Sequence, residues 1–205
     1  MKATQRVISA VATRNLFESE NKSLKLLLEN LWMHSFATAC LGKRLGEELK
    51  IKNTENLFLM GIIHDIGKML LMKAIVDLFP EAPVAAPEIQ RGIYEIHTTF
   101  GAVLLKKLRF STAFIQVAEL HHWNSYPKGT DPQLLIINLA DFLAHEIGFG
   151  PGDFEFSQPA SKDQEEKLAR ITSLPSFQLL GLELDKVLGI CDEISATVKE
   201  SAGAF

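Results

Sequence analysis

Apolar residues recur at helical spacing along nearly the whole chain. Over residues 22–50 they fall every three or four positions, which places them on one face of a long helix. No segment shows the two-residue alternation, bounded by hairpin turns, that is typical of β-strands. The pattern therefore predicts an all-α fold, a compact bundle of about seven to nine helices.

Capping residues and prolines set the expected helix boundaries. A helix over 22–50 precedes one that starts at Asn53 or Thr54, runs unbroken to about Phe79 and is apolar nearly all round. A helix of that kind is expected at the centre of a bundle. Further helices are expected over 88–108, from Ser111 to His122, from Pro132 to about 148, and, after a polar linker ending near Lys162, over 163–171, 176–180 and 184–202.

Composition and charge narrow the class of protein. The 205 residues are 47% hydrophobic and carry a net charge of −4 with a pI near 5.9, so nucleic acid and anionic membranes are not expected as partners. Cys40 and Cys191 form no CxxC pair, and no disulfide is expected. The N-terminus lacks the apolar run of a signal peptide, and no stretch is apolar enough to span a membrane. We expect a cytoplasmic protein, with Met1 opening a stand-alone domain.

The stretch "GIIHDIGKMLL", residues 61–71, places three ionisable side chains inside an apolar segment. Removing one partner from a buried charged pair costs about 3–5 kcal/mol, so His64, Asp65 and Lys68 need partners or a function. Other polar side chains also interrupt apolar helices or lie at a helix end: His34, His97, His121, His122, Asp141 and His145. Their spread over several helices is typical of a metal site in the core of a bundle.

Imidazole and carboxylate ligands suit Zn, Mn, Fe or Ni, and the absence of cysteine from the set argues against a structural zinc site. Each residue also has a simpler explanation. His145 is more readily a surface or satisfied core residue, Asp141 could cap a neighbouring helix, and His121 with His122 could favour the helix dipole. Spacing alone does not decide between these explanations.

The motifs themselves resemble the HD superfamily, which is defined by an early His, a His-Asp doublet and a late Asp. These are His34 in "LWMHSFATA", His64 and Asp65 in "GIIHDIGK", and Asp141 in "NLADFLA". Within the superfamily the chain is similar to the HDOD family, the HD-related output domain, over residues 31–150. Its motifs occur in order: "LWMHSFATACLGKRL", "NLFLMGIIHDIGKMLLM", "EIHTTFGAVLLKKL", "AELHHW" and "LLIINLADFLAHEIGFG". The resemblance implies one HD-like domain over 1–205, with 151–205 as a helical extension packed on it.

The resemblance also implies a set of metal ligands. His34, His64, Asp65 and Asp141 match the superfamily metal positions, while His97, His121 and His122 resemble the extra histidines of the two-metal HD-GYP phosphodiesterases. One or two divalent ions are therefore expected, with Asp65 bridging them. The segment "HHWNSYPKG" keeps only part of the HD-GYP recognition loop, namely Tyr126 and Pro127 followed by Lys128 and Gly129.

Two functions of different kinds follow from the resemblance. HDOD members resemble bacterial signal-transduction modules, which implies a non-catalytic domain that binds a signalling protein partner or a small nucleotide-like ligand. The alternative is a metal-dependent phosphohydrolase or phosphodiesterase acting on a nucleotide or cyclic nucleotide. In that case Asp65 and Lys68 would be the catalytic residues, with Lys68 contacting a phosphate oxygen; otherwise Lys68 is a surface lysine. A filled pocket favours the first function and an open, metal-binding cleft favours the second.

Overall fold

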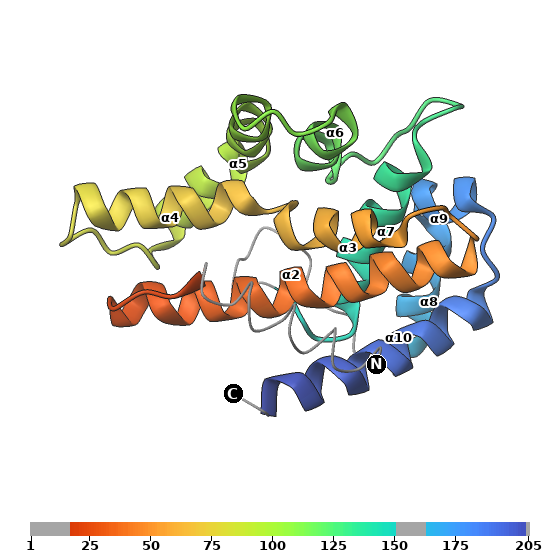
Figure 1. Ribbon diagram of the computed structural model, residues 1–205. Coiled ribbons are helices and arrows are strands. Elements are labelled where there is room, and N and C mark those ends of the chain that lie inside the picture. Colours follow the sequence, from red (N-terminus) through yellow and green to blue (C-terminus); the bar gives the residue numbers. More distant parts are fainter. Residues whose placement is uncertain (1–16, 151–162, 204–205) are drawn as a thin grey trace.

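The computed structural model describes residues 17–150 and 163–203, and these residues contain no β-strand (Figure 1). The all-α fold class predicted from the sequence is confirmed. The helices are α2 (Lys22–Glu48), α3 (Thr54–Ile63), α4 (Ile66–Leu78), α5 (Pro87–Lys107), α6 (Thr112–Leu120), α7 (Pro132–Glu146), α8 (Gln164–Ser173), α9 (Pro175–Leu180) and α10 (Leu184–Gly203). The polar linker expected up to Lys162 lies outside the described residues.

One predicted helix is wrong: the chain breaks between α3 and α4 instead of continuing from Thr54 to Phe79. Asp65 has φ −99° and ψ 18°, which ends the regular helical path before α4 resumes at Ile66. Because apolar residues surround the break on both sides, periodicity gives no sign of it. In a regular helix consecutive side chains point about 100° apart. The break lets His64 and Asp65 face the same point, and their Nε2 and Oδ2 atoms lie 3.5 Å apart.

The longest described helix is α2, which packs against α3, α7 and α10. Its apolar side chains Leu28, Leu31, Phe36 and Leu41 are fully buried. The helix predicted from Thr54 to Phe79 was expected at the centre of the bundle. That expectation holds only for α3 and the start of α4. The end of α4 reaches the edge of the molecule, where Leu78 and Phe79 are 72% and 65% exposed (Figure 1).

Two glycines allow helices to approach closely beside the His64–Asp65 break. A Cβ added to Gly61 would overlap the backbone of Ala39, where α3 crosses α2. A Cβ added to Gly67 would overlap the main-chain oxygen of His97, where α4 crosses α5 opposite Gly101. These glycines set the backbone of the break against α2 and α5, which both carry histidines of the presumed site.

The C-terminal helices belong to the same body. The helix α10 lies along α2 (Figure 1) and buries Val187, Ile190, Ile194 and Val198 in the common core. Cys40 and Cys191 are both buried and form no disulfide. Among the described residues, none of the helices has the length and apolar character needed to cross a membrane.

Candidate metal centre

Seven polar residues that are far apart in the sequence meet between the helices. They come from α2, the α3–α4 break, α5, the turn after α6, and α7. Their ligand atoms form two groups in which all atoms lie within 4.8 Å of one another. We name them the His34 cluster, made of His34, His64 and Asp141, and the His97 cluster, made of Asp65, His97, His121 and His122.

Four of the imidazoles are oriented by main-chain carbonyl groups. The Nδ1 atoms of His34 and His64 lie 2.9 Å and 2.8 Å from the carbonyl oxygens of Phe149 and Gly61. The Nδ1 atoms of His97 and His121 lie 2.6 Å and 3.0 Å from the carbonyl oxygens of Tyr94 and Val117. An Nδ1–H that donates to a carbonyl leaves Nε2 as the lone-pair nitrogen, as in metal-binding histidines. All four Nε2 atoms face the interior of the site.

Asp65 lies between the two clusters. Its Oδ1 is 3.3 Å from the Nε2 atoms of both His97 and His121. Its Oδ2 is 3.5 Å from Nε2 of His64 and 3.8 Å from Nε2 of His34. Ligand atoms that share an ion at about 2.1 Å are themselves roughly 3.0–3.4 Å apart, so the two Oδ1 separations suit coordination and the two Oδ2 separations are somewhat longer. One carboxylate could therefore serve two ions.

Several of these buried atoms lack a hydrogen bond. Among the described residues, no partner satisfies Nε2 of His64, His97 or His121, or Oδ1 of Asp65. An unsatisfied buried polar group costs about 1–3 kcal/mol, and native proteins contain few of them. Three of these atoms belong to the His97 cluster and one to the His34 cluster, as expected of two sets of metal ligands without their ions.

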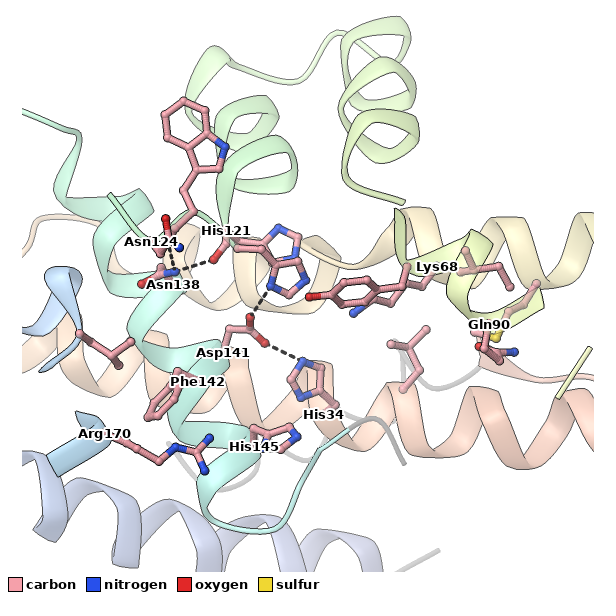
Figure 2. Close-up of a pocket in the computed structure, with 17 residues that line it drawn as sticks. His34, Lys68, Gln90, His121, Asn124, Asn138, Asp141, Phe142, His145 and Arg170 are labelled. Atoms are coloured by element: carbon pink, nitrogen blue, oxygen red, sulfur yellow. Dashed lines mark hydrogen bonds and ion pairs between the residues drawn. The ribbon is translucent and has the colours of Figure 1, made fainter. Parts of the chain in front are cut away.

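Asp141 completes the His34 cluster from α7. Its Oδ1 lies 2.9 Å from Nε2 of His34 and 3.6 Å from Nε2 of His64, and its Oδ2 lies 3.5 Å from Nδ1 of His122. Figure 2 shows His34 and Asp141 directed toward each other across the pocket. His122 is the most exposed of the seven residues and the only one whose Nδ1, rather than Nε2, faces a carboxylate here.

The electrostatics favour the ligand forms of these groups except His64, whose raised pKa favours its protonated form. Burial raises the pKa of Asp65, but the charges of Lys68 and His64 outweigh burial and hold it well below its ordinary value. Burial likewise raises the pKa of Asp141, but its contacts with His34 and His64 outweigh burial and hold the pKa well below its ordinary value. Burial lowers the pKa of His121. Burial and the nearby charge of His121 together lower the pKa of His122 well below its usual range. The pKa of His64 is raised, because the carboxylates of Asp65 and Asp141 outweigh the effect of burial.

Lys68 does not lie on the surface. It is only 7% exposed, and its Nζ lies 2.7 Å from Oδ2 of Asp65. The same Nζ lies 5.7 Å from the centroid of the Tyr94 ring. The surface-lysine interpretation is therefore wrong, and Lys68 is the cationic partner of the central carboxylate.

A pocket of about 220 Å³ opens beside the centre and is lined by His34, Lys68, His121, His122 and Asp141 (Figure 2). Its walls also include residues that sequence reasoning did not select: Tyr94, Trp123, Asn138, Phe142 and Arg170. His145 lines the pocket but belongs to neither cluster.

Some of the missed residues had a signal in the sequence. Asn138 lies one helical turn before Asp141 on α7, and its amide donates to the carbonyl oxygens of His121 and Trp123 at 2.6 Å and 3.2 Å. Tyr94 lies one turn before His97 on α5, and its ring is 5.6 Å from the His97 ring. The carbonyl of Phe149 and the side chain of Arg170 had no such signal, because only the tertiary fold brings them to the site.

Comparison with solved structures identifies the fold. The chain is similar to the HD domain of the L. monocytogenes phosphodiesterase PgpH, with 20% identity and a TM-score of 0.53 over 88% of this chain and 99% of that one. The same domain in complex with cyclic-di-AMP gives 20% identity and a TM-score of 0.50 over 84% and 91%. At this identity the likeness shows an HD-domain fold. A comparison with curated proteins finds no match.

The family follows from the sequence match. The family model described as HDOD domain matches residues 1–124, which is more than half of the chain. The protein therefore belongs to the HDOD family, as its motifs predict. The matched segment contains six of the seven clustered residues, and Asp141 lies beyond its end.

Proposed function

We propose that this chain is a metal-dependent phosphohydrolase that acts on a small, nucleotide-like phosphate ester. The observation that carries the proposal is the set of four buried ligand atoms without a hydrogen bond, in His64, Asp65, His97 and His121. Divalent ions held by the two clusters would supply Lewis acidity and an activated water for the hydrolysis of a phosphate ester. The pocket beside the clusters would hold the ester.

The charge of the centre suits an anionic ligand once an ion is present. Asp65 and Asp141 contribute two negative charges, and Lys68 contributes one positive charge. With neutral imidazoles the sum is one negative charge, which a single divalent ion would reverse. A phosphate group would then be attracted to the centre, and Lys68, which lines the pocket, could donate to one of its oxygens.

The walls of the pocket suit the rest of a nucleotide. Tyr94, Trp123 and Phe142 offer aromatic surface on which a base can stack. The HD domain of PgpH binds cyclic-di-AMP, which supports a nucleotide-like ligand for this chain. Ligand pockets commonly enclose about 300–1,000 Å³. The smaller volume of about 220 Å³ favours enclosure of one nucleotide unit over a whole cyclic dinucleotide.

The proposal is tested by hydrolysis of bis(p-nitrophenyl) phosphate with Mn²⁺ or Fe²⁺, followed by a panel of nucleotides. We expect turnover that chelation abolishes and that Asp65→Ala reduces by at least about 100-fold, since that variant removes a residue of both ion positions. Asp77→Ala is the matched control, because Asp77 is an exposed aspartate on α4. Absence of turnover in the metal-loaded protein with every substrate would contradict the proposal.

The second candidate is the non-catalytic signalling module that the HDOD resemblance implies. The ion pair of Lys68 with Asp65 favours it, because this contact partly neutralises the centre without any metal. Such a module would bind a nucleotide or a protein partner and release it unchanged. Calorimetric binding of a nucleotide with no product after prolonged incubation would support this candidate instead. As part of this second candidate, we propose that the module acts in the bacterial cytoplasm.

A further inference from the structure

We propose that the two clusters take up metal ions in a fixed order, the His97 cluster first and the His34 cluster second, because Lys68 holds the Asp65 oxygen that the second ion needs. This inference rests on the proposed metal-binding function. It assigns Lys68 a positioning role that is separate from any contact with substrate.

The His97 cluster is ready to receive an ion. Nε2 of His97, Nε2 of His121 and Oδ1 of Asp65 are all buried, and none has a hydrogen bond among the described residues. Both nitrogens lie 3.3 Å from the same carboxylate oxygen. An ion placed among them would satisfy three atoms whose desolvation has already occurred on folding. No hydrogen bond has to be broken first.

The His34 cluster is already partly satisfied. Oδ2 of Asp65, the oxygen nearest to this cluster, is paired with Nζ of Lys68 at 2.7 Å. Nε2 of His34 lies 2.9 Å from Oδ1 of Asp141. Only Nε2 of His64 is buried without a hydrogen bond. An ion entering here must loosen the contact of Lys68 with Oδ2 of Asp65, so part of its binding free energy is lost.

The charge of Lys68 acts in the same direction. The ammonium contacts Oδ2, so an ion on that oxygen would lie nearer to it than an ion on Oδ1. Repulsion between like charges rises as their distance falls and is strong in a buried site. Lys68 also lines the pocket, which gives it a place to move when the second ion arrives. Filling the second position would thus direct an ammonium group into the pocket where an anionic ligand would lie.

The order can be measured by calorimetric titration of the metal-free protein with Co²⁺, combined with elemental analysis after gel filtration at one equivalent. We expect two phases whose affinities differ by roughly tenfold or more. His97→Ala should remove the tighter phase, and His34→Ala should remove only the weaker one. Lys68→Met keeps the apolar stem and removes the charge, so it should tighten the weaker phase roughly tenfold. His145→Ala, in the same pocket but in neither cluster, should change neither phase.

Circular dichroism checks that each variant is folded. If His97→Ala is not folded, Lys68→Met alone still tests the order. Loss of the tighter phase in His34→Ala with its retention in His97→Ala would overturn the order, as would a single phase equally reduced by both. An unchanged weaker phase in Lys68→Met would remove the role of Lys68. No binding of Co²⁺ by the wild-type protein would overturn the proposed function and this inference together, whereas tight binding in the opposite order would overturn this inference alone.

Discussion

Asp65 is the residue on which both clusters depend, because its two oxygens face different histidines. The doublet of His64 and Asp65 was visible in the sequence because two ionisable residues interrupt an apolar segment. The role of Lys68 was not visible. A lysine after such a doublet can extend into solvent or turn back, and only its burial beside Tyr94 and Asp65 distinguishes the two.

At the residue scale, the carboxylates should make the metal-free protein sensitive to acid. The pKa of Asp141 is lowered in the folded protein, so its contribution to stability is present above its ordinary pKa of about 3.9 and is lost as the pH falls through the folded value. We expect the free energy of unfolding in chelator to fall as the pH drops below about 4.

Urea unfolding between pH 2 and pH 7 measures this dependence. Asp141→Asn should be less stable at neutral pH and show a shallower fall in acid, since its side chain does not titrate. Asp77→Asn, at an exposed position on α4, should follow the wild-type profile. A wild-type acid slope in Asp141→Asn would show that this carboxylate does not stabilise the fold.

At the scale of elements, the sequence predicted where helices lie far better than where one is interrupted. The N-cap at Ser111 and the start of α7 at Pro132 were predicted correctly, because caps and prolines mark them. The break at His64–Asp65 was missed, because no proline or turn motif marks it. The close crossing of α4 and α5, where Gly67 meets the main chain of His97, comes from the fold alone.

The crossing of α4 and α5 can be tested with one methyl group. Gly67→Ala should destabilise the protein by about 1–3 kcal/mol, because the new Cβ would overlap the main-chain oxygen of His97. It should also lower bound metal, since the two helices must separate. Gly92→Ala on α5 is the control: a Cβ there meets nothing, and the variant should gain up to about 1 kcal/mol. Equal stabilities for the two variants in urea unfolding would refute the proposed close packing.

At the scale of the whole molecule, α10 is bound to the rest of the protein by apolar burial more than by charge. Ile194 is 1% exposed, while the ion pair of Arg44 with Glu193 lies at the surface. Ile194→Ala should cost about 2–5 kcal/mol, whereas Glu193→Gln should cost less than about 1 kcal/mol. Chemical denaturation distinguishes these values. A small loss for Ile194→Ala would show that the C-terminal helix contributes little to the core.

Bound metal should also stabilise the entire fold, since its ligands come from helices across the molecule. An ion at a thousand times its Kd contributes about 4 kcal/mol. For a chain of this length that corresponds to a Tm lower by roughly 10 °C after chelation, measured by scanning calorimetry. Asp65→Ala should show almost no response to chelator. A Tm that chelation leaves unchanged in wild-type protein would contradict metal binding between these helices.

The central claim is that imidazole and carboxylate groups from five parts of the chain hold metal at one centre. Anomalous diffraction from crystals grown with Co²⁺ tests it most directly. We expect strong peaks about 2.0–2.2 Å from imidazole Nε2 atoms of the two clusters, with Asp65 between them. Peaks confined to surface carboxylates, or a centre that stays free of Co²⁺ at saturating concentration, would contradict the account.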